Sequence, residues 1–127
     1  GPDYNQLMEM GAHLEPGDAM YVTDGEAKKD DAGKARGFYL LPKIGMEETV
    51  KAFQVGEGKY GAHNWKRGTD WSRYYDAAYR HLMAWAEGET CDPKDGQHHL
   101  AAVIFCMMVL MEYEATGKGR DFRDLNP

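Results

Sequence analysis

AAVIFCMMVLM, the stretch from Ala101 to Met111, decides the fold of this 127-residue chain. Its apolar side chains cover every side of a helix, and a helix of this kind is buried all round in a folded protein. The sequence therefore predicts a helix over about residues 98–115. Because so short a chain has few other helices to enclose it, we expect this helix also to pack across a homo-oligomer interface.

Two amphipathic helices are predicted before this one. The first covers about residues 45–57, where apolar residues recur at helical spacing, and we expect the glycines at 56, 58 and 61 to end it. The second covers about residues 72–86, with Ser72 as its N-cap. A loop rich in Gly, Asp and Pro, residues 87–97, leads into the last helix. The predicted fold is mainly α, a small helical bundle that assembles into an oligomer.

The chain begins with a polar stretch. Residues 1–37 are rich in Gly and Asp and show no sustained period, so we expect an irregular or flexible N-terminal arm. A short apolar segment, Phe38 to Pro42, follows and is consistent with an edge strand or an extended anchor. Residues 38–127 are expected to form one helical nucleotide-binding domain, because the clusters of charged and aromatic residues lie within them.

Charge and composition exclude several classes of protein. The net charge of −6 lacks the basic footprint that binding to nucleic-acid polymers needs, yet a local basic pocket or metal ions can still hold a nucleotide. The two cysteines, Cys91 and Cys106, have neither the number nor the spacing of a disulfide scaffold or a zinc site. The longest apolar run, residues 100–111, is too short to span a bilayer, and no signal peptide is visible. We therefore expect a cytoplasmic protein without a membrane or nucleic-acid-polymer partner.

The first functional cluster is KYGAHNWKRG, residues 59–68. Cations that suit phosphates alternate here with aromatic rings that suit a purine base. The residues predicted to bind substrate are therefore Tyr60, His63, Asn64, Trp65, Lys66 and Arg67. The same pattern is also typical of a connection between helices whose aromatic rings plug the core.

The second cluster lies on the predicted helix 72–86 and contains Asp76, Arg80 and His81. Asp76 and Arg80 are four residues apart and can form a surface ion pair, which contributes little to stability. The functional alternative places Asp76 on a metal ion and Arg80 or His81 on a phosphate.

Acidic residues form the remaining clusters. The loop EGETCDPKDG, residues 87–96, lies ahead of His98 and His99 and offers carboxylates of the kind that magnesium prefers. Asp, Gly and Pro are equally the residues of ordinary turns. Glu47 and Glu48 stand in the first turn of a predicted helix, where acidic side chains suit the helix dipole. They bear on a metal site only if they face the other acids.

Three of these stretches follow one another in the order of a known family. The strings GKARGFYLLP (33–42), KYGAHNWKRG (59–68) and SRYYDAAYRHLMAWAEGETCDPKDGQHHLA (72–101) resemble the phage and prophage family of dATP/dGTP diphosphohydrolase N-terminal domains. The resemblance covers about residues 33–119. That family looks related to the all-helical MazG-like pyrophosphohydrolases, which are oligomeric bundles that bind magnesium or manganese on helix-borne carboxylates. The resemblance implies cleavage of a purine deoxynucleoside triphosphate to the monophosphate and pyrophosphate, in the cytoplasm of a bacterial host.

The clusters and the resemblance together assign roles to particular residues. Divalent ions, Mg²⁺ or Mn²⁺, would be held by four carboxylates: Glu48, Asp76, Glu89 and Asp92. The catalytic residues would be basic, with Lys59 and Arg80 neutralising the leaving pyrophosphate and His81 or His99 positioning water or phosphate.

One departure from the MazG-like signature leaves other functions open. Lys51 stands where the third acid of that signature would be. The first alternative is therefore a phage protein that sequesters a nucleotide-derived host defence signal without hydrolysing it. The second alternative is a structural or regulatory helical oligomer.

Overall fold

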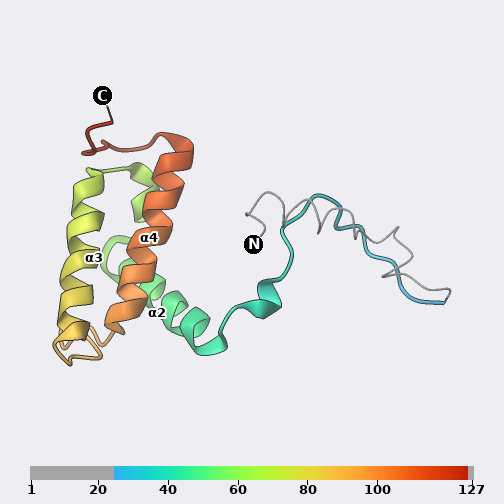
Figure 1. Cartoon of the computed structure of the whole chain (residues 1–127), viewed down its shortest axis with the longest axis horizontal. Coiled ribbons are helices and arrows are strands. Elements are labelled where there is room, and N and C mark those ends of the chain that lie inside the picture. Colours follow the sequence, from blue (N-terminus) through green and yellow to red (C-terminus); the bar gives the residue numbers. More distant parts are fainter. Residues whose placement is uncertain (1–24, 126–127) are drawn as a thin grey trace. The chain divides into compact units, whose positions relative to one another are not determined.

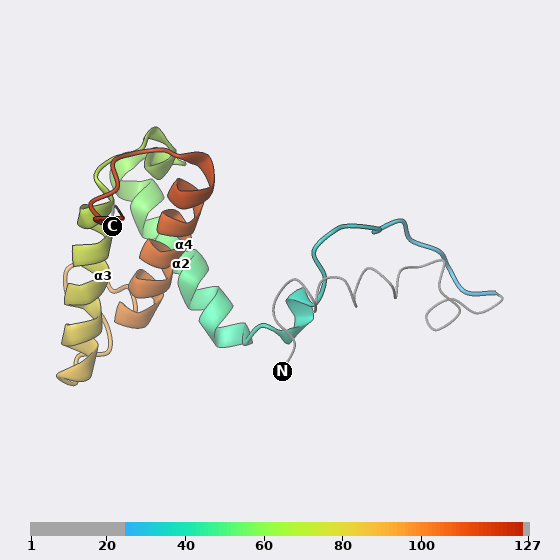
Figure 2. The ribbon, with the colours of Figure 1, turned by 45° about the horizontal axis from the view of Figure 1, so that its top comes forward.

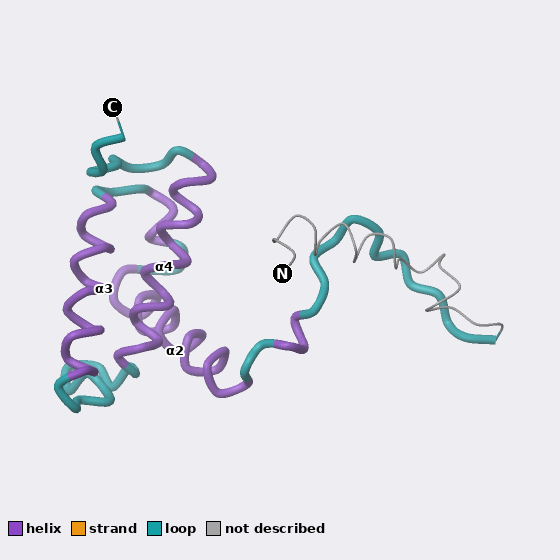
Figure 3. Tube along the Cα trace, viewed as in Figure 1, coloured by secondary structure: helices purple, strands orange, loops and turns teal. Residues whose placement is uncertain are grey.

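The computed structural model describes residues 25–125, so residues 1–24, which hold most of the expected N-terminal arm, lie outside the described residues. Within the described range the chain is helical and contains no strand, which confirms the mainly-α prediction (Figures 1 and 3). The elements in order are η1 Phe38–Leu40, α2 Lys43–Tyr60, η2 Asn64–Arg67, α3 Trp71–Ala86 and α4 His99–Thr116.

The chain divides into two units between Leu41 and Pro42. In the described part of the first unit, Phe38 to Leu40 form a single turn of 3-10 helix, so the expected edge strand is absent there. The turn forms because Gly37 adopts a left-handed conformation and the backbone N–H of Leu41 donates to the carbonyl of Phe38 at 3.1 Å. Pro42, the first residue of the second unit, has φ −60° and occupies the N-cap position of α2.

In the second unit, α3 and α4 run antiparallel side by side, and α2 crosses α4 (Figures 1 and 2). The centre of their packing is a cluster of buried side chains from α3 and α4, namely Trp71, Val109 and Tyr113. Two hydrogen bonds satisfy the polar atoms of this cluster. The indole N–H of Trp71 donates to the carbonyl of Lys118 at 2.7 Å, and the Tyr113 hydroxyl donates to the carbonyl of Trp65 at 2.6 Å. Full burial of a side chain such as Val109 contributes about 1.5–3 kcal/mol.

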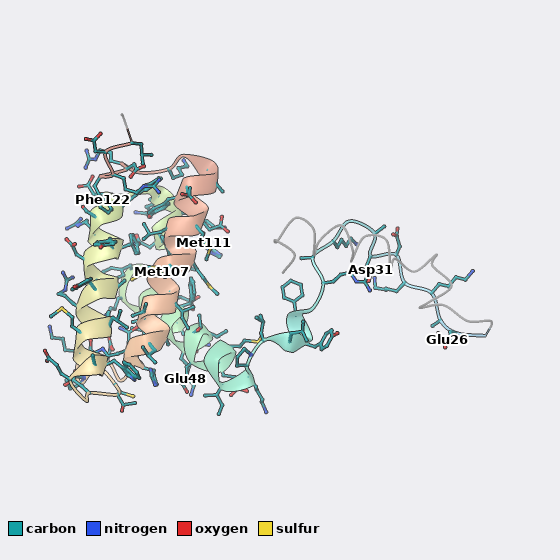
Figure 4. The ribbon with its side chains drawn as sticks, in the orientation of Figure 1. Glu26, Asp31, Glu48, Met107, Met111 and Phe122 are labelled. Carbon is teal, nitrogen blue, oxygen red and sulfur yellow. The ribbon has the colours of Figure 1, made fainter. Side chains whose placement is uncertain are left out.

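Helix α4 is only partly enclosed by the rest of its own chain. Its buried side includes Ala101, Cys106, Val109 and Tyr113. The opposite side exposes an apolar stripe made of Ile104, Met107, Met108 and Met111. Figure 4 labels Met107 and Met111 on this helix. One described chain therefore leaves uncovered part of the stretch that the sequence predicts to be buried all round.

By length and composition, α4 is the one helix among residues 25–125 that is long and apolar enough to cross a membrane. The expectation that this segment is too short counted only the run 100–111, whereas the helix has 18 residues. This criterion is weak evidence for a membrane span, since core helices pass it too, and α4 packs on both α2 and α3.

The helix ends differ from the predicted ones for local reasons. Gly56 and Gly58 lie inside α2 and do not end it, because each glycine costs helix stability only about 1 kcal/mol. A Cβ at Gly56 would lie 3.9 Å from the Phe105 ring, an ordinary van der Waals contact, so this part of α2 packs on α4. The helix ends at Gly61, whose φ of 89° is unfavourable for other residues. Helix α3 begins at Trp71 rather than after a Ser72 cap.

Candidate functional site

A pocket of about 670 Å³ opens between the C-terminal half of α2, the segment around η2, and the facing sides of α3 and α4. This volume lies in the range of small-molecule sites. Its walls combine aromatic rings with polar and cationic groups, among them Lys59, Tyr60, His63, Asn64, Arg73 and His81. The pocket therefore joins the KYGAHNWKRG segment to α3, although these stretches are separate in the sequence.

The residues predicted to bind substrate divide into two groups. Tyr60, His63, Asn64 and Trp65 line the pocket, whereas Lys66 and Arg67 are exposed and do not line it. The side chains that line the pocket differ in how far neighbouring residues hold them in place. Tyr60 is 67% exposed, whereas Trp65 packs against the core cluster and its carbonyl accepts the Tyr113 hydrogen bond. Lys66 lies over the Trp65 ring at 5.8 Å. Trp65 thus serves the core as well as the pocket wall.

Lys59, predicted to be catalytic, lines the pocket and also joins two elements. Its ammonium group donates to the Asp95 carboxylate at 2.7 Å, which links the end of α2 to the loop between α3 and α4. This hydrogen bond raises the pKa of Lys59. Burial of Asp95 favours its neutral form, but the hydrogen bonds from Lys59 and Gln97 outweigh burial and lower the pKa of this carboxyl group. The pair is therefore charged at neutral pH.

His81 and His99, also predicted to be catalytic, are in direct contact. Their Nδ1 atoms lie 2.8 Å apart, and Nε2 of His99 lies 2.7 Å from Oε1 of Glu89. Because a carboxylate only accepts hydrogen bonds, Nε2 of His99 is the donor to Glu89. A neutral His99 ring then presents a lone pair at Nδ1, and Nδ1 of His81 donates to it. Burial lowers the pKa of His81, and the neighbouring His99 lowers it further.

Asp92 lies beside the two histidines. One ligand atom each from His81, Asp92 and His99 can be chosen so that all lie within 4.8 Å of one another. The loop around Asp92 is held by its backbone, because the N–H of Asp92 donates to Gln97 at 2.8 Å and the N–H of His99 donates to Thr90 at 3.0 Å. His99 is itself only 3% exposed.

The four carboxylates predicted to hold a divalent ion are not gathered in one place. Glu48 accepts a hydrogen bond from Lys51 at 3.0 Å and does not line the pocket. Asp76 lies with Arg80 at a shallow depression on α3, and no ion pair joins the two in the described part of the chain. Asp76 precedes Ala77, a residue that lines the pocket, by one position, which turns its side chain about 100° around the helix. Glu48 lies two positions before Val50, the first residue of α2 that lines the pocket. Only Glu89 and Asp92 reach the histidine cluster, so this carboxylate set does not fit a shared ion.

Arg73 and Gln97 line the pocket and were missed in the sequence. Arg73 carried a usable signal, because Arg73, Ala77 and His81 recur every four residues and so share one helix face. Gln97 lies in an irregular loop, where no periodicity marks its direction. Cys106 also lines the pocket, but burial raises its pKa to about 11, so it stays a thiol at neutral pH and is not a nucleophile.

The fold and the pocket define a class, a small all-helical domain with a nucleotide-sized, aromatic and cationic pocket. The model of the family dATP/dGTP diphosphohydrolase, N-terminal, matches residues 24–123, and the chain belongs to this family. No curated protein and no solved structure matches the chain. The family suggested by the sequence motifs is thereby confirmed.

Proposed function

We propose that this chain binds a purine deoxynucleoside triphosphate in the pocket and hydrolyses it to the monophosphate and pyrophosphate. The observation that carries the proposal is the convergence of Lys59, Arg73 and His81 with Tyr60 and Asn64 on one pocket. The family name, dATP/dGTP diphosphohydrolase, supplies the reaction and the base.

The chemistry of the pocket walls supports an orientation for the nucleotide. The exposed Tyr60 ring offers a stacking surface for the purine, and Asn64 offers an amide for hydrogen bonds to the base edge. The guanidinium group of Arg73 is suited to two phosphate oxygens at once, and Lys59 can add a further donor while it keeps its bond to Asp95.

In the proposed reaction, a water attacks the α-phosphorus and the bond to the oxygen that bridges to the β-phosphate breaks. Pyrophosphate leaves with negative charge, which Arg73 and Lys59 stabilise. His81 faces the pocket and positions the attacking water or a phosphate oxygen. Glu89 and His99 hold the His81 ring in place through their two short hydrogen bonds.

Product analysis tests the proposal. The chain is incubated with each of the four deoxynucleoside triphosphates and with Mg²⁺ or Mn²⁺, and nucleotides and pyrophosphate are separated by ion exchange. We expect dAMP or dGMP together with equimolar pyrophosphate. Arg73→Gln should lower kcat/KM at least tenfold, because a hydrogen bond to a charged group contributes about 1.5–3 kcal/mol. Lys94→Gln, on the exposed part of the loop, is the matched control. Absence of monophosphate and pyrophosphate from all four substrates would remove the claim of catalysis.

One observation favours a second function, binding without hydrolysis. Lys51 occupies the position of the third acid in the MazG-like signature, and it is paired with Glu48 at 3.0 Å. The same pocket would then sequester a nucleotide or a nucleotide-derived host defence signal. A ligand recovered intact after the complex is denatured supports sequestration, whereas a cleaved product supports the enzyme.

We also propose that the protein acts in the cytoplasm as a homodimer or larger homo-oligomer. The apolar stripe of Ile104, Met107, Met108 and Met111 supports the oligomer, because these residues recur along one side of α4 at the spacing of a helix–helix contact. A second copy presents the same stripe, so two such surfaces complement one another around a twofold axis.

A further inference from the structure

We infer that His81, Asp92 and His99 form a binding site for a transition-metal ion of the kind that accepts imidazole ligands, such as Zn²⁺ or Co²⁺. The site differs from the four-carboxylate set expected from the sequence, of which it retains only Asp92 as a ligand. The site needs only these side chains and does not depend on the proposed hydrolysis.

The number and kind of donors fit such an ion. Two imidazole nitrogens and one carboxylate oxygen lie within 4.8 Å of one another. Three protein ligands with one further position open to water or substrate are typical of catalytic zinc sites. Imidazole suits zinc, copper, iron and nickel, whereas magnesium prefers an all-oxygen shell. A site with two nitrogens and one carboxylate therefore selects against Mg²⁺.

Glu89 occupies the position of an outer-shell partner. A histidine that binds a metal commonly donates its other ring N–H to a carboxylate, which fixes the tautomer and points the free nitrogen at the ion. In this chain Nε2 of His99 lies 2.7 Å from Glu89, while its Nδ1 faces His81. The lone pair of this buried ring is therefore directed toward the place where the ion would bind.

A metal ion can take the place of the proton that lies between the two histidines. Their Nδ1 atoms, 2.8 Å apart, share one proton. Two nitrogens on a tetrahedral ion with bonds of about 2.0–2.1 Å are roughly 3.3 Å apart, so the rings need to separate by only about half an ångström. His81 can keep its proton by carrying it on Nε2 instead of Nδ1, so its ring stays neutral and both Nδ1 lone pairs become available.

Backbone contacts within the loop hold Asp92 beside the two histidines, so binding of an ion needs no large rearrangement of the loop. The hairpin-like loop is closed by the bridge between Cys91 and His98 and by the hydrogen bond from the N–H of Gly96 to the carbonyl of Asp92 at 2.7 Å. His81 also lines the pocket, so an ion at this site would lie at the pocket edge. A ligand in the pocket could then reach the open coordination position.

The test is direct metal binding by the untagged full chain after treatment with a chelator. Co²⁺ is added and its visible absorption is followed, and Zn²⁺ is measured by calorimetry. We expect one Co²⁺ per chain with the intense spectrum of tetrahedral coordination, displacement by Zn²⁺, and no displacement by millimolar Mg²⁺. Asp92→Asn should weaken binding at least tenfold, and Glu89→Gln should weaken it about 10- to 100-fold through the outer shell.

Glu87→Gln provides the matched control, since it makes the same chemical change two residues from Glu89 on an exposed side chain. It should leave the affinity unchanged. The test uses the loop carboxylates because substitution of the buried His99 could unfold the chain, and circular dichroism verifies that each variant is folded. A folded wild-type chain that binds neither Co²⁺ nor Zn²⁺ at one per chain overturns the inference. The inference is also overturned if neither Asp92→Asn nor Glu89→Gln changes the affinity for the metal ion.

Discussion

The Nδ1 atoms of His81 and His99 lie 2.8 Å apart, and this contact ties the C-terminal half of α3 to the first turn of α4 at the edge of the pocket. The two rings can form this bond only when one nitrogen carries a proton and the other a lone pair. Glu89 selects that arrangement by accepting from the far side of His99. The same contact therefore positions side chains of the site and stabilises the packing of α3 on α4.

Loss of the His99 ring should destabilise the fold. His99 is buried, and His99→Gln removes the ring nitrogens that contact the half-buried His81 and the exposed Glu89, so we expect a loss of about 1–3 kcal/mol in the free energy of unfolding. Urea denaturation followed by circular dichroism measures it. The control is His63→Asn at an exposed position with φ 59°, where Asn accepts the left-handed backbone. Equal stability of the two variants would show that the contact contributes little.

The Lys59–Asp95 pair should make stability depend on pH in a predictable direction. The folded-state pKa of Asp95 is lowered, so its contribution is present above the unfolded value of about 3.9 and is lost as pH falls through the folded value. Lys59 has a raised pKa, so its contribution persists from neutral pH up through the unfolded value of about 10.4 and is lost above it.

Asp95→Asn should therefore lower the free energy of unfolding near pH 7 by under about 1 kcal/mol, because Lys59 is 46% exposed and water screens the pair. The difference between wild type and variant should shrink as the pH falls below about 3.9, and it should disappear once the pH is below the lowered folded-state pKa of Asp95, where both side chains at position 95 are neutral. Unfolding curves across pH measure it. A difference that is constant from pH 7 to pH 3 contradicts the assigned role of the ion pair.

Two glycines after α4 should respond differently to alanine. Gly117 and Gly119 have φ values of 72° and 75°, but a Cβ at Gly117 meets open space, whereas one at Gly119 would overlap the Thr69 carbonyl oxygen. Gly117→Ala should cost about 1–2 kcal/mol from the backbone alone. Gly119→Ala should cost clearly more, because the strand-like segment that carries Arg120 must move away from Thr69. Melting temperatures of the two variants compare these costs, and similar values would contradict the close approach.

The exposed stripe of α4 should control assembly. We expect the wild-type chain to have a mass in solution of at least twice 14.3 kDa, measured by light scattering after gel filtration. Met107→Glu combined with Met111→Glu should give a folded monomer, because charges on the stripe oppose burial against a second copy. Met83→Glu, at an exposed methionine on α3, should leave assembly intact. A monomeric wild-type chain would exclude this interface.

Periodicity was sufficient to predict α2 and α3, because apolar residues at helical spacing define a buried side in each, whereas α4 was predicted from an unbroken apolar run. Periodicity did not predict the helix ends, since Gly56 and Gly58 lie inside α2, where a glycine costs only about 1 kcal/mol, and the helix ends at Gly61. Residue types in the sequence marked His81, His99 and Lys59 as candidates. Their partners depended on tertiary structure, as Lys59 reaches Asp95 across 36 residues of chain. Glu48 and Asp76 were wrongly placed at the site, because an acidic side chain alone does not indicate which side of a helix faces the pocket.

The proposal that the pocket between the η2 region and α3 binds a nucleotide is tested most directly by an NMR titration. The ¹⁵N-labelled chain is titrated with a dGTP analogue that has a methylene group between the α and β phosphates. The account predicts saturable shifts of the Trp65 indole N–H and of the backbone amides of Tyr60, Asn64 and Gln97, while the indole of Trp85 outside the pocket stays in place. If a saturating analogue moves none of the pocket signals, or moves only Trp85 and its neighbours, the nucleotide pocket is contradicted.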